Sequence, residues 1–236
     1  MAEKSKVYFT NLRTTFDCNL LQKLKKLITA AGIGKIDFTN KYAAIKIHFG
    51  EPGNLAFLRP NYAKVVADTV KELGGKPFLT DCNTLYVGGR KNALDHLDAA
   101  YENGFSPFST GCHVLIADGL KGTDETLVPI AGDYVKEAKI GTAIMDADVF
   151  ISLTHFKGHE ATGFGGCLKN IGMGCGSRAG KMEMHSSGKP HVAQEKCVGC
   201  GSCQKDCAHS AITITDRKAS IDHAKCVGCG RCIGRC

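Results

Sequence analysis

The chain has 236 residues, of which 43% are hydrophobic and 22% are charged, a composition that excludes disordered and fibrous proteins. The formal net charge is +7, but the lysines and arginines are scattered without a compact run, so we expect no nucleic-acid partner. Because no apolar run reaches the roughly 18 residues of a membrane helix and the first residues lack the apolar core of a signal peptide, we expect a cytoplasmic protein without membrane association.

Short apolar strands alternate with helical patterns from the first residue to about residue 185. This alternation predicts an α/β fold with a mostly parallel, doubly wound sheet. In chain order we expect a strand at 6–10, a helix over Asp17–Ala31, a strand at 43–49, a helix over Asn61–Leu73, a strand at 77–81, a helix over Arg90–Glu102, and strands at 113–118 and 148–155. Two shorter strands, LVPI and VKEAKI, are expected between the last two.

Polar residues follow four of these strands at the point where each strand ends. In parallel sheets, ligands bind outside the carboxyl ends of the strands. The alternatives are a hydrogen-bonded core position for each histidine and a helix or turn cap for each aspartate. The residues are His48, Glu51, Asp81, Asp118, His155, Lys157 and His159.

A glycine-rich stretch, residues 158–180, follows the last of these strands and holds eight glycines. This composition predicts either a flexible surface loop or an anion-binding loop. The cation Lys169 and its neighbour Asn170 favour the anion-binding loop. A zinc-protease HExxH motif is excluded because position 163 is glycine, and Walker A and GxGxxG nucleotide motifs are absent. Cys167 and Cys175 are either buried apolar residues or ligands of a third metal.

Eight of the thirteen cysteines lie in two repeats of C-x2-C-x2-C-x3-C, 29 residues apart, both beginning KCVGCG. This spacing is the bacterial two-cluster ferredoxin pattern, in which the fourth cysteine of each run binds the other cluster. Structural zinc sites more often use two well-separated CxxC pairs. We therefore expect two [4Fe–4S] clusters, one held by Cys197, Cys200, Cys203 and Cys236 and the other by Cys226, Cys229, Cys232 and Cys207.

The two regions predict two domains, an α/β domain at 1–190 and a ferredoxin-like α+β module at 191–236. Residues 184–191 are polar and contain glycine and proline, as a linker would, and AITITDRKASID between the repeats predicts a hairpin. Because a cluster ligand, Cys236, is the last residue, we expect that the module is truncated at its C-terminus.

Long motifs resemble one known family: HFGEPGNLAFLRPNYA at 48–63, GGKPFLTDCNTLYVGGRKNALDHL at 74–97, HFKGHEATGFGGCLKNIGMGCGSRAGKMEMH at 155–185 and the cysteine repeats. They are similar to the iron–sulfur centre proteins known as domain of unknown function 362, fused here to a ferredoxin-like module. The resemblance implies the fold type and the clusters without a settled reaction. The family more often has alanine where Cys167 stands, which implies that Cys167 is no essential ligand.

The leading hypothesis is an iron–sulfur oxidoreductase that passes electrons between an external donor, such as a ferredoxin, and a site at the strand ends. Lysines would bind a small anionic substrate, and one histidine would donate a proton. The alternative is a non-catalytic electron-transfer subunit with an acidic redox partner, and a third hypothesis is cluster carriage for other proteins. The expected site comprises His48, Glu51, Asp81, His155, Lys157, His159, Lys169 and Asn170.

Overall fold

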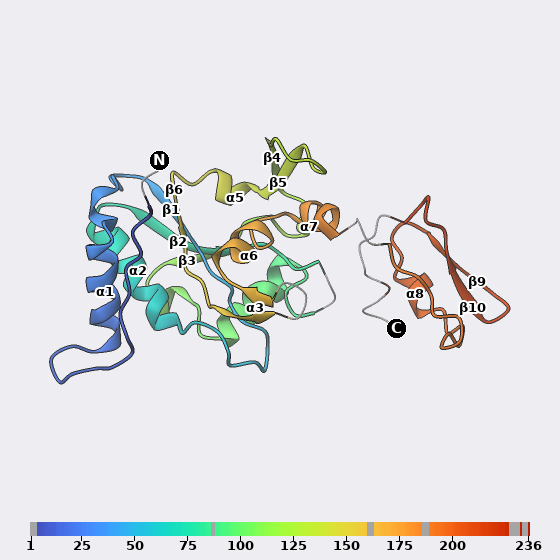
Figure 1. The fold of residues 1–236 in the computed structure, drawn as a ribbon, viewed down its shortest axis with the longest axis horizontal. Coiled ribbons are helices and arrows are strands. Elements are labelled where there is room, and N and C mark those ends of the chain that lie inside the picture. Colours follow the sequence, from blue (N-terminus) through green and yellow to red (C-terminus); the bar gives the residue numbers. More distant parts are fainter. Residues whose placement is uncertain (1–3, 86–87, 160–162, 186–188, 227–231, 233–235) are drawn as a thin grey trace. The chain divides into compact units, whose positions relative to one another are not determined.

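The computed structural model describes residues 4–85, 88–159, 163–185, 189–226, 232 and 236 (Figure 1). The chain divides into two compact units, and each is described by itself. Unit 1 comprises Met1–Asp81, Asp98–Leu115 and Ala143–Ile171. Unit 2 comprises Cys82–Leu97, Ile116–Thr142 and Gly172–Cys236.

Helices and strands alternate through most of the described chain. In order they are α1 (Leu20–Ala30), a 3-10 turn η1 (Ile33–Lys35), β1 (Tyr42–Lys46), α2 (Pro60–Glu72), β2 (Lys76–Asp81), α3 (Ala93–Glu102), α4 (Pro107–Thr110), β3 (His113–Ile116), β4 (Glu125–Pro129), β5 (Glu137–Gly141), α5 (Thr142–Met145), β6 (Val149–Ser152), β7 (Lys157–His159), β8 (Gly163–Gly165), α6 (Cys167–Gly172), α7 (Arg178–His185), α8 (Ser202–Lys205), β9 (Ile212–Thr215) and β10 (Lys218–Ile221).

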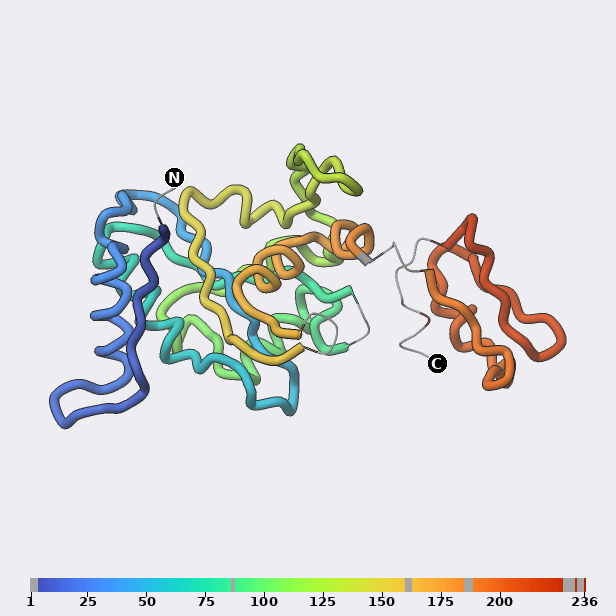
Figure 2. Tube along the Cα trace, in the orientation of Figure 1, coloured from blue at the N-terminus to red at the C-terminus, as the bar shows by residue number. Residues whose placement is uncertain are grey.

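Four strands form the main sheet in the order β3-β2-β1-β6. β1 runs parallel to both of its neighbours, with Lys46 opposite Thr80 of β2 and Ser152 of β6. Figure 2 shows β1 in blue beside the yellow segment that contains β6. The chain adds β2 and β3 on one side of β1 and then returns to add β6 on the other side. The carboxyl ends of β1 and β6 therefore meet at the point where the strand order reverses.

The core of unit 1 forms because β1 is apolar and α2 is amphipathic. Ala43, Ala44 and Ile45 of β1 are fully buried. α2 starts at Pro60, whose fixed φ suits the first helical position, and places apolar side chains on one face at a helical spacing. That face packs on β1 and β2. The buried residues of the face are Ala63, Val66, Ala67 and Val70.

The predicted α/β architecture is confirmed as a mixed α/β fold with this sheet, and one predicted strand is wrong. Residues 6–10 form no strand among the described residues, and Val7 and Phe9 are 91% and 86% exposed. The apolar alternation of this segment is therefore not matched by burial. The two short strands predicted between residues 125 and 141 are present and pair as the antiparallel hairpin β4–β5.

The hairpin predicted between the cysteine repeats is confirmed as β9–β10, with Ile212 opposite Ile221. Its turn residues Asp216 and Arg217 have φ of 49° and 57°, the left-handed conformation that two-residue hairpin turns require. Part of the predicted linker packs on neighbouring residues of unit 2, because the His191 ring contacts the His223 ring at a centroid distance of 4.8 Å. The predicted boundary between residues 190 and 191 stays a prediction.

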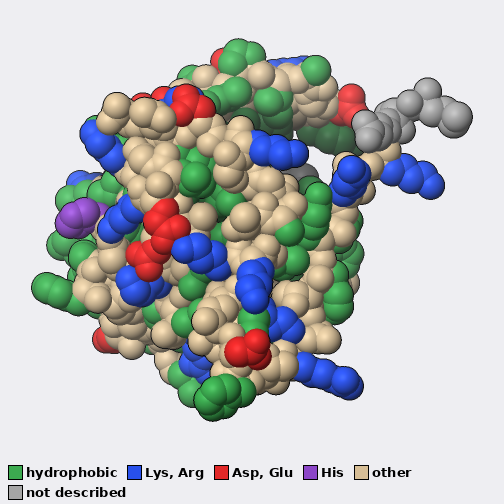
Figure 3. Space-filling view, turned by 90° about the vertical axis from the view of Figure 1, so that its left-hand side faces the viewer, with side chains coloured by type: hydrophobic (Ala, Val, Ile, Leu, Met, Phe, Trp, Pro, Cys, Tyr) green, Lys and Arg blue, Asp and Glu red, His purple; other side chains and the backbone are tan. Residues whose placement is uncertain are grey.

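Charges of both signs intermingle on the face that Figure 3 shows. In unit 1, Lys25 pairs with Glu72 at 2.7 Å and Lys64 with Asp68 at 3.0 Å, both as exposed ion pairs. Such pairs contribute little to stability, roughly 0–1 kcal/mol each. Within the described part of the chain, no helix combines the length and apolarity needed to cross a membrane.

Candidate functional site

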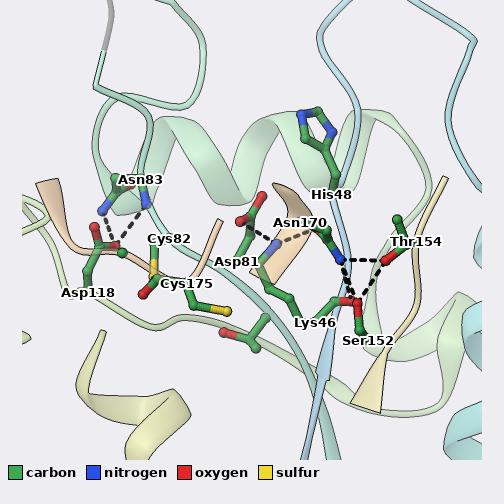
Figure 4. Close-up of polar contacts among 12 residues, drawn as sticks. Lys46, His48, Asp81, Cys82, Asn83, Asp118, Ser152, Thr154, Asn170 and Cys175 are labelled. Atoms are coloured by element: carbon green, nitrogen blue, oxygen red, sulfur yellow. Dashed lines mark hydrogen bonds and ion pairs between the residues drawn. The ribbon is translucent and has the colours of Figure 1, made fainter. Parts of the chain in front are cut away.

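A connected group of polar side chains lies in unit 1 at the carboxyl ends of β1, β2 and β6 (Figure 4). Lys46 is the last residue of β1, and its Nζ lies 2.9 Å from Asp81 Oδ1 at the end of β2 and 2.8 Å from Asn170 Oδ1 of α6. The Asn170 amide nitrogen donates to Thr154 Oγ1 at 2.9 Å and to Ser152 Oγ at 3.2 Å. The network thus joins three strand ends to one short helix.

The Lys46–Asp81 pair is buried, with side-chain exposures of only 1% and 4%. Lys46 is buried because it lies in the central strand between Ile45 and Ile47, which are also buried. A buried ammonium is costly unless a carboxylate and further hydrogen bonds compensate its lost hydration. Asp81 provides the opposite charge and Asn170 provides the additional acceptor.

The orientation of the Asn170 amide follows from its neighbours. Its oxygen faces the Lys46 ammonium, which can only donate hydrogen bonds. The nitrogen therefore faces the hydroxyl oxygens of Ser152 and Thr154, and at 3.4 Å the backbone carbonyl of Lys46. The two hydroxyl groups also lie 2.8 Å apart. A flipped amide would place donors against the ammonium, so one orientation is strongly favoured.

His48 and Glu51 lie in the loop that follows β1, and both are exposed. The Nδ1 atom of His48 accepts a hydrogen bond from Gly50 N at 3.0 Å, so in the neutral ring Nε2 carries the proton. Gly50 has φ of 90°, and a Cβ there would come within 2.8 Å of the Phe57 ring. Glycine is therefore required for this turn, which fixes the ring of His48 beside the strand edge.

The segment that follows β6 forms a small hairpin, β7–β8, before α6. Lys157 is opposite Gly165 in the register, and His159 is opposite Gly163. The Lys169 Nζ contacts His159 Nε2, so α6 and the hairpin bring two basic groups together. Lys157 is exposed and His155 is half-buried. The described residues at the start of the glycine-rich stretch thus form paired strands, and Lys157 and His159 lie on the same face of β7 because side chains alternate along a strand.

Sequence reasoning found Asp81 and Asn170 of this network but missed Lys46, Ser152 and Thr154. A signal for Lys46 was present, because a lysine between two isoleucines of a buried strand needs a partner of opposite charge. Asp81 ends the neighbouring predicted strand and was the nearest such candidate. The hydroxyl groups had no comparable signal, since serine and threonine are common at strand ends and in turns.

Asp118 forms a separate buried group within unit 2. Its Oδ1 accepts hydrogen bonds at 2.9 Å from both the backbone nitrogen and the side-chain nitrogen of Asn83. This arrangement corresponds to the turn-capping alternative for Asp118. Cys82 and Cys175 are buried and Cys167 is exposed. The described residues include no group of three or more His, Cys, Asp or Glu placed to hold a single metal ion.

The cysteine repeats lie in unit 2, and Cys229 falls outside the described residues. Backbone N–H groups point at two of the sulfurs: Ala219 N donates to Cys197 Sγ and Ala211 N to Cys207 Sγ, each at 3.3 Å. Gly199 has φ of 68°, and a Cβ there would overlap the Arg217 backbone of the hairpin turn. Glycine is therefore needed for the first repeat to pack against the hairpin.

The thiols of the first predicted ligand set have different proton affinities. Hydrogen bonds from the backbone of Ala219 and Gly199 lower the pKa of Cys197, and the Ser202 hydroxyl lowers the pKa of Cys200. Burial raises the pKa of Cys203, and negative charge on Cys200 and Cys236 raises it further. A [4Fe–4S] cluster takes one cysteine thiolate on each of its four irons. The cysteines of the repeats, with backbone N–H groups directed at two of their sulfurs, fit that requirement.

Replacing Asp81 by Asn is expected to lower the free energy of unfolding by roughly 3–5 kcal/mol, because it leaves the Lys46 ammonium buried without its counter-charge. Chemical denaturation followed by circular dichroism measures this loss. The double variant Lys46→Met, Asp81→Leu removes both charges and is expected to recover much of it. Equal stability of Asp81→Asn and the unmodified protein would contradict the burial argument.

In reduced, metal-free protein, Cys200 and Cys197 are expected to react with iodoacetamide at lower pH than Cys203. A lowered pKa leaves more thiolate at a given pH, and a raised pKa leaves less. Cys112 is the control and should react last, because burial raises its pKa and restricts access. Peptide mass spectrometry across a pH series measures the order, and earlier reaction of Cys203 would disprove it.

The comparisons with known proteins identify the family. No curated protein and no solved structure matches the chain. Residues 43–227 match a family described as Domain of unknown function (DUF362). The match spans the sheet, the polar network and the first cysteine repeat, which is well over half of the 236 residues. The protein therefore belongs to the DUF362 family.

Proposed function

We propose that the protein is an iron–sulfur oxidoreductase that passes electrons through two [4Fe–4S] clusters to or from a site at the carboxyl ends of β1 and β6. The observation that carries the proposal is the pair of C-x2-C-x2-C-x3-C repeats in one chain with a family-specific α/β region. N–H groups directed at Cys197 and Cys207 support it, because such donors stabilise cluster thiolates. In this proposal the C-terminal module has a ferredoxin-like fold.

Each cluster would be held by three cysteines of one repeat and the fourth cysteine of the other. When bound, the clusters would supply one-electron transfer, which the protein's own side chains cannot perform. The support for this crossed arrangement is the spacing of the cysteines in the two repeats. The ligand sets are Cys197, Cys200, Cys203 and Cys236, and Cys226, Cys229, Cys232 and Cys207.

The substrate site is proposed at the reversal of strand order between β1 and β6. The order β3-β2-β1-β6 supports a doubly wound sheet, in which ligands bind at this point. Lys157, with Lys169 in contact with His159, would bind a small anionic substrate. His48 would donate a proton from Nε2, since its Nδ1 accepts from Gly50. Glu51 and His155 complete the proposed set.

Anaerobic reconstitution with iron and sulfide tests the cofactor. We expect about eight iron atoms per chain and the electron paramagnetic resonance signal of reduced [4Fe–4S] clusters. Cys200→Ser is expected to lower the iron content by up to half, whereas the control Cys112→Ser, a buried cysteine outside the repeats, should leave it unchanged. Stoichiometric zinc in place of iron would overturn the cofactor assignment.

A second candidate function is a non-catalytic electron-transfer subunit for a partner enzyme. The charge of residues 191–236 favours it, because seven Lys and Arg stand against four Asp and Glu, which suits an acidic redox partner such as a ferredoxin. Both functions place the protein in the cytoplasm, without nucleic-acid or membrane association. Anaerobic affinity purification separates them: a stable partner enzyme favours the subunit, while binding of small carboxylates or phosphates that Lys157→Met abolishes favours the oxidoreductase.

A further inference from the structure

Residues 155–159 and 163–171, here called the cationic loop, comprise the paired strands β7 and β8 and the helix α6, and keep several of their large apolar side chains in solvent. Phe156 is 72% exposed, Phe164 is 56% exposed and Leu168 is 85% exposed. α6 has no buried residue. The rings of Phe156 and Phe164 stack on each other at a centroid distance of 5.7 Å, a contact within the loop itself. Burial of these side chains therefore contributes little to holding the loop on the sheet.

Several contacts described for the loop are internal to it, and those of Asn170 reach the sheet. The β7–β8 pairing and the contact between Lys169 and His159 join one part of the loop to another. The Asn170 side chain, in contrast, bonds Lys46 of β1 and Ser152 of β6, and also Thr154 just beyond β6. Its two polar atoms connect α6 to both strands whose ends form the proposed site.

We propose that Asn170 is a positioning residue, whose amide holds the cationic loop at the strand ends, and that the buried Lys46–Asp81 pair sets the direction of that amide. The ammonium of Lys46 takes the amide oxygen and so directs the nitrogen towards Ser152 and Thr154 (Figure 4). This replaces the catalytic role expected for Asn170 with an indirect one.

The position of Asn170 explains what the amide would control. Lys169 precedes it directly in α6 and contacts His159 of β7. A shift of α6 therefore moves Lys169 relative to the ends of β1 and β6 and changes its contact with His159. The proposal rests on the proposed function only in assigning these basic groups to the substrate site, because the anchoring itself is independent of any reaction.

Hydrogen–deuterium exchange of peptides covering 155–171 tests the proposal in the full chain. Asn170→Ala is expected to speed exchange of these peptides roughly tenfold, the effect of losing about 1.4 kcal/mol of local anchoring. Asn103→Ala is the matched control, since Asn103 is also half-buried and donates to a backbone carbonyl, that of Phe49, at 2.9 Å. The control should leave exchange of 155–171 unchanged. Unchanged exchange in Asn170→Ala would overturn the proposal.

A second variant keeps Asn170 and the buried ion pair and removes the hydroxyl acceptors. Ser152→Ala with Thr154→Val leaves the bond from Lys46 to the Asn170 oxygen intact, but the Asn170 nitrogen then keeps only the Lys46 carbonyl, at 3.4 Å, as an acceptor. We expect exchange of 155–171 to become faster in this variant as well. Unchanged exchange would show that these bonds do not hold the loop and would overturn the proposal.

These measurements do not depend on cluster chemistry. Iron content and the reduced-cluster signal are expected to be the same in Asn170→Ala as in the unmodified protein, because residue 170 is not one of the predicted cluster ligands. A protein without clusters but with the predicted exchange change would refute the proposed function and leave the positioning role standing. The reverse result would refute the positioning role alone.

Discussion

A lysine ammonium at the buried end of the central strand has to be neutralised, and the geometry of unit 1 is arranged around that requirement. Strand register places Asp81 of β2 within 2.9 Å of Lys46. The ammonium also donates a hydrogen bond to the side-chain oxygen of Asn170, which lies in a helix more than a hundred residues later in the sequence. Breaking a buried pair of this kind is strongly destabilising, whereas a complete pair is tolerated. The ion pair therefore links the sheet to the loop that carries the proposed site.

In the cationic loop, two glycines lie in a paired strand opposite the basic residues. Gly163 and Gly165 pair opposite His159 and Lys157, so the basic side chains lie on a hairpin face without bulky neighbours across the strand. The aromatic rings of Phe156 and Phe164 stack on each other, and both side chains are exposed. Apolar surface is thus left in water, which is unfavourable for stability and is common where a surface serves binding. Polar anchoring by Asn170 is consistent with such a loop.

The cysteine-rich part of unit 2 depends on backbone geometry more than on side-chain packing. The left-handed turn at Asp216 and Arg217 directs the β9–β10 hairpin back so that Ala219 N meets the sulfur of Cys197. Gly199 allows the first repeat to approach that turn. The same N–H donors that lower the pKa of Cys197 favour thiolate, the form that binds iron. Local conformation thus favours the thiolate form that the proposed cluster would require.

The sequence by itself determined the alternation of strands and helices, the β9–β10 hairpin, the family and the spacing of the cysteines, because these are encoded in periodicity, turn residues and short motifs. It also indicated Asp81 and Asn170, since polar residues after apolar strands are conspicuous. It misjudged residues 6–10, whose apolar alternation finds no partner strand among the described residues. Only the tertiary structure decided that Lys46 joins Asp81 to Asn170, because that contact depends on strand register and on a helix 124 residues away in sequence, neither of which local pattern can specify.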